Sequence, residues 1–125
     1  DNMCLHSISD KKPRSEGFGY KLMKPLGSNT VAGEYFRFPI KRIGKWYEAD
    51  IITAISIDSK TSYVSGFHIF TSLRQALSYN TFYCNRNIYK VKYRKGRILG
   101  KQMGKNCIIA DEIMVVKLVK RRTKK

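Results

Sequence analysis

The residues best placed to do chemistry are basic side chains on a predicted strand near the C-terminal end of the chain. Residues 88–94 alternate with a period of two, which places Lys90, Lys92 and Arg94 on one face. Lysines two positions apart on a strand are spaced by about 7 Å, close to the phosphate repeat along one nucleic-acid strand. The tyrosines of this segment point to the opposite face, so we expect them to pack in the core. The further candidate phosphate-binding residues are Lys95, Arg97, Lys101, Lys105, Lys120, Arg121 and Arg122.

The charge of the whole chain supports this assignment. The formal net charge is +16, from 25 Lys plus Arg against 9 Asp plus Glu. Residues 86–125 hold 14 basic residues and two acids, Asp111 and Glu112, so they carry +12 of the +16. A surplus of this size attracts polyanions, which narrows the partners to nucleic acid, an anionic membrane surface or an acidic protein. Because phosphate contacts carry no sequence information, we expect little sequence specificity.

A second basic cluster lies beside two aromatic residues. An exposed aromatic ring among lysines can stack on unpaired bases, whereas a Trp followed by a Tyr is also typical of a core anchor. Both interpretations stay open from the sequence. The cluster consists of Arg37, Lys41, Arg42 and Lys45, next to Trp46 and Tyr47.

Catalytic and metal-binding candidates are few. His68 is the one histidine inside a predicted regular element, where it is either a general base or a structural residue. Cys4 and His6 offer two metal ligands where a metal site needs three or four. The glycines at 96, 100 and 104 open no helix, so the chain has no phosphate-binding loop or dinucleotide fingerprint, and no cofactor is predicted.

The length and composition predict one α+β domain. The chain has 125 residues, of which 42% are hydrophobic, enough for one core of ordinary size. We expect a flexible arm at residues 1–16, the domain at 17–119 and a basic tail at 120–125. The domain is predicted to be a mostly antiparallel sheet of five to seven strands with one or two short helices.

The elements that position the candidate residues follow from local patterns. We expect strands at 20–24 (ended by Pro25), 35–40 (at a sheet edge), 66–70, 88–94 and 107–119, the last buried on both faces. Residues 46–57 fit a strand better than a helix because they are rich in β-branched side chains. Ser72 and Gln75 form a capping box that begins a helix ending near Asn80. Lys95 and Gly96 predict a turn or bulge, and residues 100–106 a mobile loop.

The sequence has few features that indicate a cellular location. No run of about 18 apolar residues is present, so no transmembrane helix is predicted, and the start shows no secretory signal. The three cysteines, Cys4, Cys84 and Cys107, are odd in number and far apart, which favours free thiols in a reducing compartment. The expected location is intracellular, in the host cytoplasm or nucleus, or in a virion.

Short motifs spread along the chain suggest a family. Met3-Cys4-Leu5, the segment Ser-Gly-Phe-His at 65–68 followed by a short helix, and the final strand at 110–119 resemble small uncharacterised proteins of phages and large DNA viruses. The resemblance implies a viral or mobile-element accessory protein and carries no known activity.

The segment 66–72, with Ala76 and Tyr79, is also similar to the central strand and helix of ADP-ribosyltransferase-like folds. That family has an Arg or His on its first strand, where this chain has Lys21 and Lys24. It also uses a late Glu, for which Glu112 is the one candidate. The resemblance implies a related scaffold, and an active enzyme of this type would use His68 and Glu112.

The sequence therefore favours a non-enzymatic basic accessory protein that binds DNA or RNA through phosphate contacts. A first alternative is a virion or interaction protein whose charge matches an acidic protein partner. A second is a degenerate or active ADP-ribosyltransferase-like enzyme. Whether the protein is an enzyme is left open, and its oligomeric state is not predicted.

Overall fold

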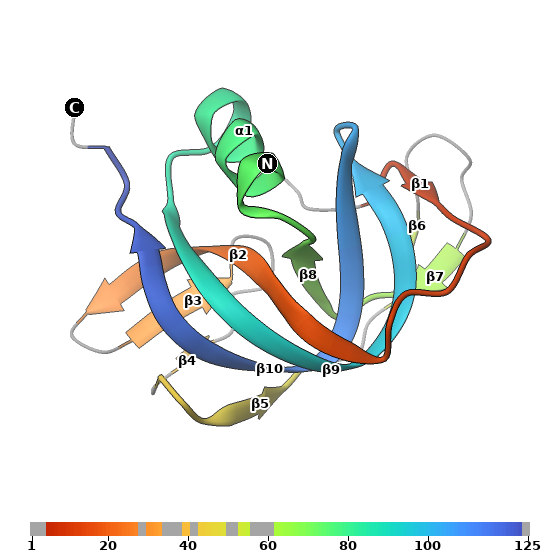
Figure 1. The fold of residues 1–125 in the computed structure, drawn as a ribbon, viewed down its shortest axis with the longest axis horizontal. Coiled ribbons are helices and arrows are strands. Elements are labelled where there is room, and N and C mark those ends of the chain that lie inside the picture. Colours follow the sequence, from red (N-terminus) through yellow and green to blue (C-terminus); the bar gives the residue numbers. More distant parts are fainter. Residues whose placement is uncertain are drawn as a thin grey trace.

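The fold is a mostly antiparallel β-sheet, as the sequence predicts, and the residues that the structure describes include one helix (Figure 1). The computed structural model describes residues 5–27, 30–33, 39–40, 43–49, 53–55 and 62–123. The strands among these residues are β1 (Ser7–Ile8), β2 (Glu16–Gly27), β3 (Thr30–Gly33), β4 (Pro39–Ile40), β5 (Trp46–Glu48), β6 (Thr53–Ile55), β7 (Ser62–Val64), β8 (Phe67–Phe70), β9 (Asn87–Gln102) and β10 (Lys105–Lys120), and the helix is α1 (Leu73–Tyr83). All of the strand pairings described are antiparallel.

A long curved hairpin of β9 and β10 organises the sheet. Both strands have 16 residues. β10 pairs with β9 and β8, and β2 pairs with both β8 and β9, so these four strands form a closed ring of pairings (Figure 1). Three register shifts interrupt the β9–β10 ladder, and such bulges increase the bend and twist that let a sheet close. β1 lies against β9 and β5 against β10, while β6 and β7 form a separate pair.

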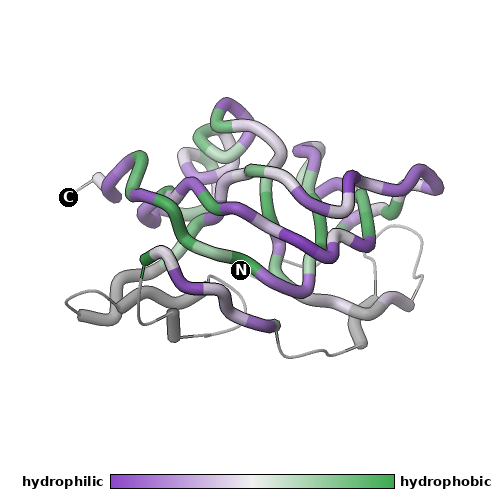
Figure 2. The backbone as a smooth tube through the Cα atoms, turned by 60° about the horizontal axis from the view of Figure 1, so that its bottom comes forward, coloured by the Kyte–Doolittle hydropathy of each residue, from purple (hydrophilic) through white to green (hydrophobic). Residues whose placement is uncertain are grey.

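The main core lies inside this ring. Tyr89, Val91 and Tyr93 of β9 are buried there, which confirms the predicted inward face of residues 88–94. Phe67 and Ile69 of β8 pack against them. Lys90, Lys92 and Arg94 of β9 lie on the opposite face, and Figure 2 shows the alternation of hydrophilic and hydrophobic residues along the chain.

Helix α1 covers a second hydrophobic cluster at one end of the ring. Ser72 is its N-cap and accepts a hydrogen bond from the Gln75 backbone N–H, as predicted. Ala76 and Tyr79 pack on Leu22 of β2 and Ile88 of β9. The helix runs to Tyr83, one turn beyond the predicted end near Asn80.

Two predicted element boundaries are wrong. Residues 100–106 are not a mobile loop, because β9 continues to Gln102 and β10 begins at Lys105. The tight turn between them uses Met103 and Gly104, both at positive φ (51° and 77°), the geometry of a type I′ hairpin turn. Pro25 does not end β2, which extends to Gly27 with a register irregularity after Pro25.

Both ends of the described chain are attached to β9. From Leu5 onward, the predicted arm is packed: Leu5 is fully buried, the His6 backbone N–H donates to the Lys101 carbonyl oxygen of β9 at 2.8 Å, and β1 pairs with β9. At the other end, the Arg122 backbone N–H donates to Asn87 Oδ1 at 2.8 Å, so the start of the basic tail is fixed beside the beginning of β9.

Other predictions fall partly outside the described residues. The predicted edge strand 35–40 is described only at β4, which ends the strand order of the sheet, and the stretch 46–57 only at β5 and β6, where it is strand as favoured. The bulge predicted at Lys95 and Gly96 is present, because Lys95 has a positive φ of 58° and the ladder shifts register beside it. In the described part of the chain, no helix is long and apolar enough to cross a membrane.

Gly19 allows β2 to join β9 to β8. A Cβ atom at this position would lie 2.3 Å from Ile69 Cγ2 and 2.8 Å from the Phe70 carbonyl oxygen, so only glycine fits without backbone movement. We expect Gly19→Ala to lower the free energy of unfolding by about 1–3 kcal/mol, the usual cost of overpacking. Urea denaturation followed by circular dichroism measures this.

Gly17→Ala is the matched control, because its new Cβ would meet only the Tyr93 side chain, at 3.1 Å. We expect a smaller loss, below about 1 kcal/mol. Equal losses for the two variants would contradict the close crossing of β2 and β8.

Candidate nucleic-acid interface

The outward face of β9 changes character along the strand. Ile88 is covered by α1, and the next residues on the same face are Lys90, Lys92 and Arg94. The predicted clustering of these three cations on one face is therefore present. Their environments differ, however, because the two lysines and the arginine have different neighbours.

Lys90 and Lys92 surround an exposed aromatic ring on β2. Phe18 lies directly opposite Lys92, and its side chain is 56% exposed. The Lys90 and Lys92 ammonium groups lie 4.9 and 5.8 Å from the centre of the Phe18 ring, within the range of cation–π attraction. On the other side of β9, Lys117 of β10 pairs directly with Lys90. We refer to Lys90, Lys92 and Lys117 as the lysine cluster.

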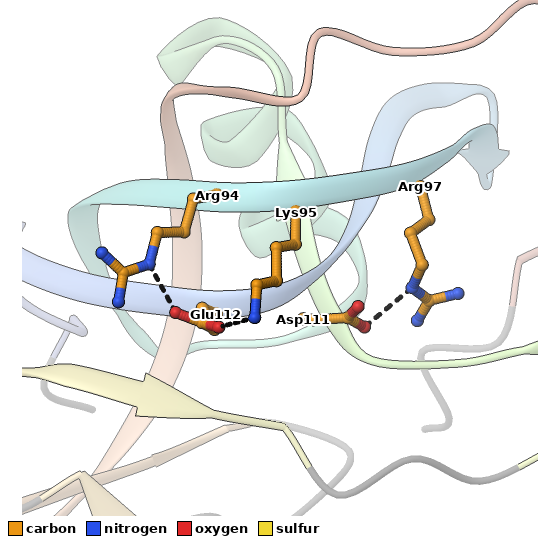
Figure 3. Close-up of polar contacts among 5 residues, drawn as sticks. All are labelled: Arg94, Lys95, Arg97, Asp111 and Glu112. Carbon is orange, nitrogen blue, oxygen red and sulfur yellow. Dashed lines mark hydrogen bonds and ion pairs between the residues drawn. The ribbon is translucent and has the colours of Figure 1, made fainter.

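The cations that follow are paired with acids, as Figure 3 shows. Arg94 and Lys95 both contact the carboxylate of Glu112, Lys95 at 2.6 Å. Arg97 contacts Asp111 at 2.7 Å and also donates to the Ser65 carbonyl oxygen. These three predicted phosphate-binding residues are therefore all paired with the two acids that the sequence places in residues 86–125, which offset two of their three charges.

Two further glutamates extend this balance. Glu16 of β2 lies opposite Arg94, and Glu48 of β5 lies opposite Glu112. Residues directly opposite one another on paired strands share a face, so the four side chains form one row across the sheet. We refer to Glu16, Arg94, Glu112 and Glu48 as the ion-pair row.

The pKa values reflect the pairing. Hydrogen bonds from Lys95 and Arg94 hold the pKa of Glu112 below its ordinary value, and the same contact raises the pKa of Lys95. Glu112 is thus a carboxylate at neutral pH with its oxygens engaged by two cations. This makes it a structural counter-ion and a poor proton donor.

The remaining predicted cations lie elsewhere. Lys101 and Lys105 flank the turn of the β9–β10 hairpin, and Lys90 lies near the opposite end of β9. Lys120 ends β10, and Arg121 and Arg122 follow it, next to the beginning of β9. The structure thus distributes the ten predicted residues over the lysine cluster, the paired section, the hairpin turn and the C-terminal end.

The second predicted cluster divides between core and surface. Tyr47 packs against the main core, whereas Trp46 lies on the outer face with the Arg94 guanidinium 3.9 Å from its ring centre. Lys45 lies over the Tyr47 ring at 5.7 Å. The other members, Arg37, Lys41 and Arg42, are outside the described residues.

His68 is a buried structural residue. Its side chain is 1% exposed, and burial, with a smaller effect of Lys21, lowers its pKa to about 3. The Lys21 ammonium is itself buried and donates to the His68 carbonyl oxygen at 3.1 Å. His68 pairs with Ile109, whereas Glu112 lies further along β10 in the ion-pair row, so the two catalytic candidates do not share a site.

The two described cysteines are free thiols. Burial raises the pKa of Cys107 to about 12, so this thiol is unreactive in the folded protein. Cys84 is partly exposed and lines a hollow of ≈ 230 Å³ at the end of α1, together with Asn80, Thr81, Asn85, Lys120 and Thr123. Cys4 is outside the described residues.

Phe18 and Lys117 are the interface residues that the sequence reasoning missed. Phe18 stands between two glycines in Gly17-Phe18-Gly19, so no alternation of polar and apolar side chains marks its face. Lys117 follows the apolar run of β10. The extra residue Val116 forms a bulge, so Lys117 lies on the face opposite to that of Val115, although simple alternation would place both on the same face. Both residues could be placed on this face only from the register between strands, which is known once β2 and β10 are paired with β9.

Comparison with known proteins gives no relative. A scan against protein-family models, a search of curated proteins and a search of solved structures each found no match.

The ion pairs of Glu112 make a pH-dependent contribution to stability. Because the pKa of Glu112 is lowered in the folded protein, this contribution is complete above the pKa of an unfolded-chain glutamate, about 4.3, and is lost as the pH falls through the lowered value. We expect Glu112→Gln to be less stable than the wild type at neutral pH. The difference should shrink as the pH falls below about 4.3 and disappear once Glu112 is protonated in the folded protein.

Urea denaturation of both proteins across the acidic range measures this difference. His68 also destabilises the fold on acidification, but it is present in both proteins and cancels. A stability difference that does not change with pH would contradict the pairing of Glu112 with Arg94 and Lys95.

Proposed function

We propose that this protein binds nucleic acid through phosphate contacts made by the lysine cluster. The observation that carries the proposal is the contrast between the two sections of the β9 face. Arg94, Lys95 and Arg97 are paired with acids, whereas no ion pair in the described part of the chain joins an acid to Lys90, Lys92 or Lys117. Part of the net charge of +16 is thus left without paired acids on the outward face of β9 and β10, at Lys90, Lys92 and Lys117.

The arrangement of the cluster supports a polyanionic partner. Lys90 and Lys117 are directly opposite on paired strands, where like charges destabilise a sheet. Lys92 is two residues from Lys90 on the same face, about 7 Å away. Phosphates arranged along a nucleic-acid strand would relieve this repulsion and release condensed counterions on binding.

The biological setting follows from the same proposal. A single α+β domain with a basic face suits a non-enzymatic accessory protein that binds DNA or RNA with little sequence specificity. The phage or large-virus origin and the intracellular or virion location expected from the sequence fit this role and remain proposals. A transferase that uses His68 and Glu112 is not proposed, because His68 is buried away from Glu112.

An acidic protein partner is the second candidate, on a different surface. Phe82 and Tyr83 at the end of α1 are 76% and 44% exposed, and Lys120 lines the hollow beside this helix end. Aromatic residues are enriched in protein interfaces, and the charge of Lys120 would attract acidic side chains of a partner. This candidate predicts a stoichiometric protein complex that the lysine cluster does not affect.

The first test is binding to labelled DNA and RNA across a series of salt concentrations. We expect the logarithm of the affinity to fall linearly with the logarithm of the salt concentration. Replacing Lys90, Lys92 and Lys117 together by Gln should weaken binding and reduce the slope by up to about three, one per lost phosphate contact. Fluorescence anisotropy measures both quantities.

The matched control replaces Lys11, Lys12 and Lys101 by Gln. This variant has the same net charge as the first, but its exposed lysines lie near the other end of β9. A control that loses as much affinity as the cluster variant would refute the assignment of the interface. A wild-type protein that does not bind at low salt would refute nucleic-acid binding altogether.

A further inference from the structure

Phe18 is an exposed aromatic ring at the centre of the positive face. It lies on β2 between Gly17 and Gly19, and its neighbours on the same face of this strand are Glu16 and Tyr20. Its neighbours across the strands are Lys90 and Lys92, whose ammonium groups lie over the ring. Phe18 is 56% exposed, so more than half of its surface is open to a ligand on this face.

A second aromatic ring lies in the same row. Phe18 pairs with Lys92, Lys92 with Met114 and Met114 with Trp46, so these four side chains share one face across β2, β9, β10 and β5. Three strand spacings separate the two rings, a distance of about 14 Å. The Arg94 guanidinium already stacks on Trp46 at 3.9 Å, which shows that planar groups fit on this face. The groups recorded over the Phe18 ring are the ammonium groups of Lys90 and Lys92.

We propose that the lysine cluster and Phe18 together bind single-stranded nucleic acid, with one base stacked on the Phe18 ring. This inference rests on the proposed function, since the lysines supply the phosphate contacts. The bases of a duplex are stacked on one another and have no free face for the ring, whereas an unpaired base has one. Every base has such a face, so the preference is for single strands and is tolerant of sequence.

The ion-pair row sets one boundary of the bound strand. Glu16, which lies opposite Arg94, is exposed, as is Glu48 at the other end of the row. Phosphates are repelled by these carboxylates, so the strand passes on the other side of Phe18, toward Lys90 and Lys117. The base on Phe18 displaces the two ammonium groups from the ring, and they remain close enough to contact the flanking phosphates.

The test compares Phe18→Leu and Phe18→Trp with the wild type. The two probes are a short fluorescein-labelled oligothymidylate and a mixed-sequence DNA duplex of the same length, at one low salt concentration. Leucine keeps the apolar contact with the lysine stems but cannot stack, so we expect about a tenfold loss of single-strand affinity with duplex affinity unchanged. Tryptophan should preserve or tighten single-strand binding.

Phe82→Leu is the matched control, since Phe82 is more exposed than Phe18 and lies at the end of α1, well away from the start of β2 (Figure 1). It should bind both probes as the wild type does. Three results would overturn the inference while leaving the proposed function intact: duplex binding as tight as single-strand binding, no effect of Phe18→Leu, or equal weakening of both probes. A wild-type protein that binds neither probe would overturn both.

Discussion

β9 is hydrogen-bonded along both of its edges, and this constraint shapes the rest of the molecule. One edge pairs with β10, and the other pairs with β2 over residues 87–94 and with β1 at residues 100–101. Between β2 and β1 the strand contains an irregular section, where Lys95 has a positive φ and the Gly96 backbone N–H donates to the Ser15 carbonyl oxygen. The strand can thus bend without leaving its backbone groups unpaired.

The irregular section also separates basic residues that are paired with acids from basic residues that are not. Beside the irregular section, Arg94, Lys95 and Arg97 form ion pairs with Glu112 and Asp111 of β10. These pairs offset most of their positive charge within the protein. Where β2, β9 and β10 run side by side, Lys90 and Lys92 have Phe18 as their neighbour, and no ion pair in the described part of the chain involves them or Lys117. Unpaired positive charge therefore lies where the sheet also presents an aromatic ring. This combination is typical of surfaces that bind unpaired nucleic acid.

Sequence reasoning predicted what depends on local pattern. The alternation of Tyr89, Val91 and Tyr93 with basic residues fixed the faces of β9 correctly, and Ser72 marked the start of α1. It failed where cross-strand pairing overrides local preference. Met103 lacks the usual signal for a positive φ, so the hairpin turn was mistaken for a loop. The ion pairs of Glu112 and the place of Phe18 depend on register between strands distant in sequence, which no local pattern contains.

The most direct test of the account is a nuclear magnetic resonance titration of the isotopically labelled protein with a short oligothymidylate at low salt. The account predicts that the largest shift changes occur in the Phe18 ring and in the amides around Phe18, Lys92 and Lys117. The amides of the hairpin turn at residues 101–105 and of the end of α1 should change little. Shift changes confined to the hairpin turn or to the end of α1, with the Phe18 ring unaffected, would contradict it.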